Sequence, residues 1–217
     1  MDNYDELLSV LLERLNPGML ATKKVPEDGL IPVGISNRHI HLSQQALDKL
    51  FGPGYQLTKL KDLSQPGQYA CKETVMICGP KGMIGNIRIL GPVRPETQIE
   101  ILQSDTFKLG IPGALRLSGD LQDTPGITIV GPRGSLEIDK GVIVAQRHIH
   151  MLPEDAGRFG VQDGEVVSIA FSGKRGGVLN NVVIRAKANS GLECHIDTEE
   201  ANALGVIPGT KITIKKN

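Results

Sequence analysis

The amino-acid sequence predicts a mainly β protein made of two small closed β-barrels capped by short helices. The chain of 217 residues contains 26 glycines and 13 prolines, which indicates many turns and therefore many short strands. Short apolar segments recur throughout, whereas helix-like segments are few and brief. One unit occurs four times: a short helix ends at glycine, the chain turns at a second glycine, and an apolar strand follows. Four units suggest two barrels with two units each, rather than a doubly wound sheet.

The composition excludes several classes of protein. Lys and Arg number 24, as do Asp and Glu, so the formal net charge is +0 and a nucleic-acid footprint is lacking. No run of about 18 apolar residues is present, which argues against a transmembrane helix. The acidic start MDNYDELL lacks the basic region of a secretory signal, and three scattered cysteines do not make a disulfide framework. We therefore expect a cytoplasmic protein with reduced thiols.

The first segment differs from the rest of the chain. Apolar residues from Tyr4 to Leu15 follow helical spacing and form one stripe, and Asn16-Pro17-Gly18 stops the pattern. We expect an amphipathic helix within residues 1–20 and a linker to residue 29. An isolated helix this short is marginal in water, so it must dock. It either packs on the rest of the same chain or on a second copy of the chain, or it serves as a targeting peptide that binds another protein.

Each of the four units carries the signals of a short helix. Ser43, Ser104 and Thr198 are predicted N-caps, because a side-chain oxygen there accepts a hydrogen bond from the first free amides. Pro153 suits the first position of the third helix. Glycine suits the left-handed position after each helix, at Gly52, Gly110, Gly160 and Gly205.

Short strands are expected between these helices. The segments GPKG (79–82) and GPRG (131–134) predict turns, with proline presetting the backbone at the second position. The predicted strands are Val75–Cys78, Ile84–Ile89, Ile127–Val130, Leu136–Ile138, Val142–Gln146 and Val182–Arg185.

The histidines carry the clearest chemical signal. Four of the five form two copies of one motif, because Arg38-His39-Ile40-His41 reappears as Arg147-His148-Ile149-His150. In an extended chain, residues i and i+2 face the same way, about 7 Å apart. Two imidazoles can therefore converge on one ion, while the isoleucine between them points into the core. Neutral imidazole is a common ligand of zinc and its neighbours, so the duplication predicts two metal sites.

A catalytic metal needs a third protein ligand and an open fourth position. His195 and Glu100 lie just upstream of the helices in the two remaining units, as the His-x-His pairs do in theirs. Glu100 lies in the alternating stretch Gln98–Ile101, so its neighbours are expected to be buried while it points into a site. By the same alternation, Cys194 points away from His195 and is expected in the core.

Arginines near these histidines suggest anion binding. Arg94 lies six residues before Glu100, and its guanidinium fork matches phosphate geometry. Arg38 and Arg147 face away from the histidines by alternation, and we expect each to pair with a carboxylate. Arg116 and Ser118 share a face that suits an anion, and an ordinary polar turn is an equally good interpretation.

Several long motifs together resemble the phosphate propanoyltransferase family, the PduL-type phosphotransacylases. They are VGISNRHIHLS (33–43), GPVRPETQIEI (91–101), SGDLQDTPGI (118–127), GVIVAQRHIHM (141–151) and HIDTEEAN (195–202). The resemblance covers roughly residues 30–215. It implies two antiparallel β-barrels that are discontinuous in sequence. Barrel one would take residues 30–37 and 146–217, and barrel two residues 38–145.

The resemblance also implies roles for individual residues. Arg94 would be catalytic and bind phosphate, Ser118 would lie near the phosphate, and Phe107 would stack on the adenine of coenzyme A. Two divalent ions, expected to be zinc, would be held by His39, His41 and Glu100 and by His148, His150 and His195.

The implied reaction interconverts acyl-CoA plus phosphate with acyl-phosphate plus CoA, with propanoyl-CoA or acetyl-CoA as substrate. Two metals and Arg94 would neutralise phosphate and aim one oxygen at the thioester carbonyl, without a covalent acyl-enzyme. The resemblance further implies a homodimer in a bacterial microcompartment that degrades propanediol or ethanolamine. Residues 1–20 would then bind shell or lumen proteins.

Three other readings of the histidines are open. A dinuclear metallohydrolase would use the same residues to cleave thioesters with water. A cupin is suggested by the spacing of His148, His150 and Glu154, but Pro153 places Glu154 on a helix. A binding module with closed structural zinc sites would need a fourth ligand, for which Asp197 is a candidate.

Overall fold

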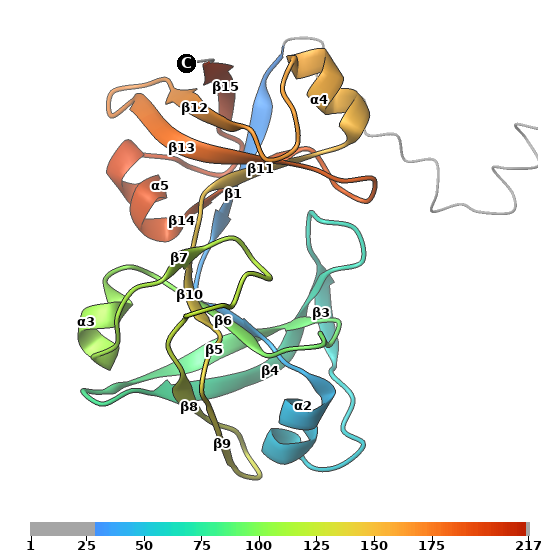
Figure 1. Cartoon of the computed structure of the whole chain (residues 1–217), viewed down its shortest axis with the longest axis vertical. Coiled ribbons are helices and arrows are strands. Elements are labelled where there is room, and N and C mark those ends of the chain that lie inside the picture. Colours follow the sequence, from blue (N-terminus) through green and yellow to red (C-terminus); the bar gives the residue numbers. More distant parts are fainter. Residues whose placement is uncertain (1–28, 216–217) are drawn as a thin grey trace, which may run out of the picture.

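The computed structural model describes residues 29–215 and confirms a mainly β fold. Two β units lie end to end along the long axis of the molecule (Figure 1). The predicted helix within residues 1–20 lies outside the described residues. Among the helices that the structure describes, none has the length and apolar character needed to cross a membrane.

The first unit is a closed barrel of six strands in the order β1-β14-β11-β13-β12-β15. Its core consists of aliphatic side chains that alternate along the strands, such as Ile149, Ile169 and Ile184, each fully buried. Branched aliphatic side chains suit such half-buried strand positions. The strands are β1 (Ile31–Ser36), β11 (His148–Met151), β12 (Val166–Phe171), β13 (Gly177–Ala186), β14 (Glu193–Asp197) and β15 (Lys211–Lys215).

The second unit is a curled sheet in the order β7-β10-β6-β2-β5-β4-β8-β9, with β3 paired to β4. It packs around a core of its own that includes Ile40, Ile77 and Ile89. The strands are β2 (His39–His41), β3 (Lys59–Asp62), β4 (Tyr69–Cys78), β5 (Met83–Gly91), β6 (Gln98–Ile101), β7 (Leu115–Arg116), β8 (Ile127–Val130), β9 (Ser135–Ile138) and β10 (Val142–Ala145).

Two features of the sheets differ from the expectation. The second unit stays open, because β7 and β9 end the strand order without pairing to each other. Both units also contain parallel as well as antiparallel strand pairs; β1 with β14 and β2 with β5 are parallel.

The two predicted turns close hairpins, since Gly79 N donates to Gly82 O and Gly131 N donates to Gly134 O, each at 2.9 Å. The domain boundaries given above stay a prediction.

The chain crosses between the units at two points that matter for the site. Asn37 and Arg38 join β1 of the barrel to β2 of the sheet, and Gln146 and Arg147 join β10 to β11. Each crossing immediately precedes a His-x-His motif. Both motifs therefore lie where the barrel meets the sheet.

The described residues contain four short helices, one in each predicted unit. The Ser43 hydroxyl caps the first of them by accepting from Ala46 N at 3.2 Å, and Pro153 occupies the first position of the third, as predicted. The helices are α2 (Gln44–Phe51), α3 (Asp105–Leu109), α4 (Pro153–Phe159) and α5 (Thr198–Leu204).

Some local predictions were wrong by small margins. Ser104 has helical backbone and caps nothing with its side chain; instead Asp105 Oδ2 accepts from Leu102 N at 2.9 Å. The cap of α5 is Asp197 rather than Thr198, because the Asp197 carboxylate reaches Glu200 N at 2.8 Å. Gly52 has φ 107° and ψ 152°, outside the left-handed helical region that the other three glycines adopt. No strand directly follows α2 at Tyr55.

Candidate active site

A cavity of about 570 Å³ lies between the barrel and the sheet. All five histidines of the chain line it, and they come from strands of both units. Arginine, glutamate and glutamine side chains complete its polar wall. Such a concave site with converging titratable groups is the natural candidate for catalysis.

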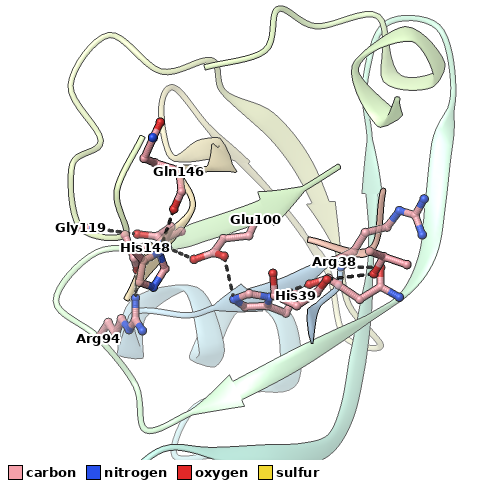
Figure 2. A network of polar contacts seen from close by, with 12 residues as sticks. Arg38, His39, Arg94, Glu100, Gly119, Gln146 and His148 are labelled. Carbon is pink, nitrogen blue, oxygen red and sulfur yellow. Dashed lines mark hydrogen bonds and ion pairs between the residues drawn. The ribbon is translucent and has the colours of Figure 1, made fainter. Parts of the chain in front are cut away.

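The first group of side chains is the sheet cluster, His39, His41 and Glu100. Strand β2 presents both histidines, and β6 runs antiparallel beside it so that Glu100 faces His39. The His39 Nε2 atom lies 3.4 Å from Glu100 Oε2, and Figure 2 shows the carboxylate directed at that ring. Ile40, between the histidines, is fully buried, as alternation predicts. The three ligand atoms lie within 4.8 Å of one another.

The second group is the barrel cluster, His148, His150 and His195. Strand β11 presents the first two, and His195 on β14 faces His148 across an antiparallel pair. His148 Nε2 lies 3.1 Å from His150 Nε2, and the centroids of the three rings are 4.7–5.1 Å apart. These three ligand atoms also lie within 4.8 Å of one another. Cys194 is fully buried on the opposite face of β14, as expected.

The two clusters are built in the same way. In each, the third residue faces the first histidine from the neighbouring antiparallel strand. In each, the first histidine places Nδ1 2.8 Å from the carbonyl oxygen two residues earlier, Asn37 for His39 and Gln146 for His148. That hydrogen bond leaves Nε2 facing the cluster. The repeat in sequence is therefore a repeat in geometry.

Burial keeps most of these histidines neutral. Desolvation, followed by repulsion from His39, lowers the pKa of His41 to about 3. Desolvation and the neighbouring imidazoles lower the pKa of His148 to about 4 and that of His150 to about 3. An imidazole must be neutral to donate its electron pair to a metal ion.

Glu100 and His39 shift each other's pKa inside the site. Burial alone would favour the neutral carboxyl, but His39 and then His41 hold the pKa of Glu100 well below its ordinary value. Burial likewise opposes a charged His39, and the Glu100 carboxylate outweighs it and raises the pKa of His39. An ionised carboxylate beside two imidazoles is the form that binds a divalent cation.

Both clusters fit a divalent metal ion. Each offers three convergent nitrogen or oxygen donors, which is the protein share of an open zinc site. His41 Nδ1 is buried and has no hydrogen-bond partner among the described residues. A buried polar atom without a partner is costly, and a bond to a metal ion would satisfy it.

Arg94 and Ser118 lie beside the sheet cluster. Arg94 Nη1 donates to Ser118 Oγ at 3.0 Å, and Gln98 Nε2 lies 2.8 Å from both Ser118 Oγ and Glu100 Oε1. The side-chain Oε1 of Gln98 accepts from Gly119 N at 2.7 Å, which holds the loop after β7 against the site. Burial lowers the pKa of Arg94, whose guanidinium nonetheless stays charged at neutral pH.

Sequence reasoning missed several polar residues of the site, among them Arg185 and Glu193 in the cavity lining and Gln98, which contacts Glu100 and Ser118. Arg185 faces His150 on the parallel neighbour β13, and Glu193 Oε2 lies 2.6 Å from His195 Nε2. A signal for two of them was present. Gln98 and Glu193 lie two residues before Glu100 and His195, so alternation along a strand places them on the same face.

Two predicted residues lie apart from the cavity lining. Phe107 is on α3 and its surface is 77% exposed. Arg116 donates to Leu115 O and Gln122 O and lies 3.7 Å from Asp120, so it belongs to a turn rather than to an anion site with Ser118.

Two further expectations are confirmed by contacts. Arg38 pairs with Asp105 and Arg147 with Glu200. Glu154 lies on helix α4, which removes the basis for a cupin.

The chain is similar to known proteins over most of its length. The family model described as phosphate propanoyltransferase matches residues 32–207. A phosphate propanoyltransferase of Rhodobacter capsulatus is 52% identical over 207 residues, which cover 95% of each chain. One of Thermotoga maritima is 54% identical, covering 87% of this chain and 90% of its own. One of Rhodopseudomonas palustris is 55% identical, covering 80% and 77%. The chain therefore belongs to the phosphate propanoyltransferase family and is a phosphate acyltransferase.

Proposed function

We propose that this enzyme is metal-dependent and interconverts acyl-CoA plus phosphate with acyl-phosphate plus CoA, with propanoyl-CoA or acetyl-CoA as substrate. One observation carries the proposal: two equivalent three-donor clusters and two half-buried arginines, Arg94 and Arg185, open onto a single cavity. That arrangement suits bringing an anion to an electrophile.

His39, His41 and Glu100 would hold one divalent ion, and His148, His150 and His195 the other. We propose zinc because imidazole-rich sets with one carboxylate or none are typical of it. When bound, such ions neutralise phosphate and polarise a carbonyl oxygen.

The residues of the chain account for phosphate binding. Arg94 and Arg185 supply positive charge from opposite units, the first beside the sheet cluster and the second beside the barrel cluster. The Ser118 hydroxyl accepts from Arg94 and from Gln98, so its own hydrogen is free to be donated to a phosphate oxygen. A charged bidentate hydrogen bond from arginine is stronger than a neutral one and fixes orientation.

Direct attack by phosphate is favoured over a covalent acyl-enzyme. A phosphate oxygen forms the new bond to the thioester carbonyl carbon, the carbon–sulfur bond breaks, and CoA leaves as the thiolate. The alternative nucleophile would be a cysteine, but none of the three cysteines lines the cavity, and burial raises the pKa of Cys71 to about 11 and that of Cys194 to about 12. Neither thiol would supply thiolate at neutral pH.

The remaining proposals rest on the family. Phe107 is exposed on α3, and an exposed aromatic ring suits stacking on the adenine of coenzyme A. A homodimer, zinc as the native ion and a place in the lumen of a bacterial microcompartment that degrades propanediol or ethanolamine belong to the same proposal. Residues 1–20 would bind shell or lumen proteins there.

The deciding experiment measures thiol release from propanoyl-CoA by the zinc-loaded protein, with and without phosphate. Release that requires phosphate is expected. Release without phosphate would instead identify a dinuclear thioester hydrolase on the same residues.

The same assay tests the ligands. His148→Ala and Glu100→Ala are expected to lose about one metal ion each together with most activity, because three donors hold each ion. Arg158→Gln, on the exposed face of α4, is the matched control. A ligand variant that keeps full turnover and metal content would remove that residue from the site.

A further inference from the structure

An arginine–carboxylate pair stands directly before each His-x-His motif. Arg38 Nε lies 2.6 Å from Asp105 Oδ2, and Arg147 Nε lies 2.5 Å from Glu200 Oε1. Neither arginine points at its cluster; Figure 2 shows the Arg38 side chain extending away from Glu100. The proposed reaction has no use for these pairs, yet the fold contains the same pair twice.

Each carboxylate lies just after the third member of a cluster in the chain. Asp105 begins α3, which follows the strand that carries Glu100. Glu200 is in the first turn of α5, which follows the strand that carries His195. Their second contacts fix them there: Asp105 Oδ2 also accepts from Leu102 N at 2.9 Å, and Glu200 Oε2 accepts from Asp197 N at 3.2 Å.

Each pair therefore ties together the two strands of one cluster. The arginine directly precedes the His-x-His strand, and the carboxylate lies in the helix that follows the strand of the third ligand. Arg147 makes one further bond, from Nη1 to Asn180 O at 2.6 Å. Asp105 is only 4% exposed, so this is not the solvated kind of ion pair that contributes little.

The arginine also lies between a histidine and the carbonyl that orients it. His39 Nδ1 is 2.8 Å from Asn37 O, and Arg38 is the residue between them. The second copy has Gln146, Arg147 and His148 in the same relation, again at 2.8 Å. Anchoring the arginine side chain holds the peptide that carries this carbonyl, and so fixes the direction of the histidine Nε2 atom.

We propose that Arg38 and Arg147 are positioning residues, each of which preorganises one metal cluster by clamping its two strands and orienting its first histidine. The proposal rests on the proposed metal sites. Partners outside the ligand shell commonly change metal affinity by about 10- to 100-fold. We expect about 10-fold here, because each arginine acts through one intervening peptide.

Charge alone predicts the opposite result. A guanidinium repels a divalent cation, so removing it should strengthen metal binding if only Coulomb forces mattered. A weaker affinity in the variant therefore reports lost positioning rather than lost charge.

The test measures zinc affinity of the full-length protein by competition with a chromophoric chelator. His150→Ala leaves only the sheet cluster intact, and His41→Ala leaves only the barrel cluster intact. In the first background Arg38→Gln should weaken zinc binding about 10-fold and Arg147→Gln should not. In the second background the two results should be exchanged.

Matched variants guard against a general loss of structure. Arg116→Gln removes an arginine whose side chain is 33% exposed, the same as that of Arg38, and should leave both affinities unchanged. Asp105→Asn should match Arg38→Gln in the first background, and the double variant should add nothing further. If either arginine variant weakens both clusters equally, the effect is general and the proposal is overturned.

Two outcomes separate this proposal from the proposed function. A parent protein that does not bind two zinc ions would overturn both. Two bound ions whose affinities are unchanged or increased in the arginine variants would overturn the positioning role alone and leave the metal sites standing.

Discussion

Desolvation is the main influence on the protonation states of the single side chains in this cavity. His41, His148 and His150 are held neutral by burial and by neighbouring imidazoles, while His39 lowers the pKa of Glu100 and Glu100 raises the pKa of His39. These three neutral imidazoles release no proton on binding a metal ion, whereas a protonated His39 must release one. In the metal-free protein the same imidazoles resist protonation, so acid lowers the stability of the folded chain.

The metal-free protein should lose stability as the pH falls below about 6.5. The pKa values of His41, His148 and His150 are about 3, 4 and 3 in the folded chain, against about 6.5 when unfolded. Between these values the unfolded chain binds protons that the folded chain does not. The free energy of unfolding therefore decreases as the pH decreases, by at most about 1.4 kcal/mol per pH unit for each histidine.

His39 has the opposite sign. Its raised pKa gives a contribution to stability that is present at low pH and lost as the pH rises through that value. It offsets part of the loss from the other three. Urea denaturation of metal-free protein at about pH 7 and about pH 5 measures the net effect, and His41→Gln should flatten the slope. A stability that is constant or higher at the lower pH would contradict the assignment.

Arg94 should matter for phosphate rather than for metal content. Replacing it with glutamine removes a half-buried guanidinium beside Ser118, so we expect kcat/KM for phosphate to fall by about 10²- to 10³-fold. Arg94→Lys should recover only part of this, because a lysine cannot donate two parallel hydrogen bonds. Steady-state kinetics and zinc analysis check both points, with Arg158→Gln as control. Loss of zinc in Arg94→Gln would show a structural role instead.

At the scale of elements, the short helices differ in how their N-termini are capped. The Ser43 hydroxyl accepts from Ala46 N, whereas Ser104 has helical backbone and no capping bond from its side chain. Two serines in equivalent units of the sequence therefore have different roles. At the start of α3 the Asp105 carboxylate instead accepts from Leu102 N, which precedes the helix, and from Arg38.

This difference predicts unequal effects of the same substitution. Ser43→Ala should lower the free energy of unfolding by about 1 kcal/mol, the usual effect of losing an N-cap. Ser104→Ala should change it by less than about 0.5 kcal/mol, because no capping bond is lost. Chemical denaturation at fixed metal content measures both, each serving as control for the other. Equal effects would mean that Ser43 does not act as a cap in solution.

At the scale of the molecule, the site exists only because the barrel and the sheet meet. The loop between β3 and β4 reaches across to the barrel. There Gln65 Nε2 donates to Gly191 O and Gly191 N donates to Gln65 Oε1, both at 3.1 Å. Ser64 Oγ also donates a hydrogen bond to Glu193, the neighbour of His195 on β14. This loop couples the strand of one cluster to the unit that holds the other.

Cutting that link should slow turnover without removing metal. Gln65 is buried, and Gln65→Ala would leave both backbone groups of Gly191 without their partner. A displacement of about 1 Å between reacting groups can cost about 10²-fold in rate, so kcat should fall markedly while zinc content stays the same. The exposed Gln162 provides the control variant Gln162→Ala. An unchanged kcat would show that the link has no part in aligning the site.

Much of this protein could be predicted from the sequence alone because the signals are local. The i, i+2 spacing of His39 with His41 and of His148 with His150 places each pair on one face, and glycines end the four helices. Composition and turn residues predicted a mainly β fold. These features depend on backbone geometry over a few residues, which a sequence displays directly.

Other features depended on the tertiary structure. The alternation of side chains along a strand predicts the face on which each side chain lies, but it does not predict which strand is the neighbour. The position of Arg185 opposite His150 could therefore not be predicted. The open second sheet and the cap at Asp197 likewise follow from pairing and packing across the fold. The two clusters share one cavity because both chain crossings between barrel and sheet come just before a histidine pair. Such contacts join residues far apart in the chain, so only the folded register of the strands decides them.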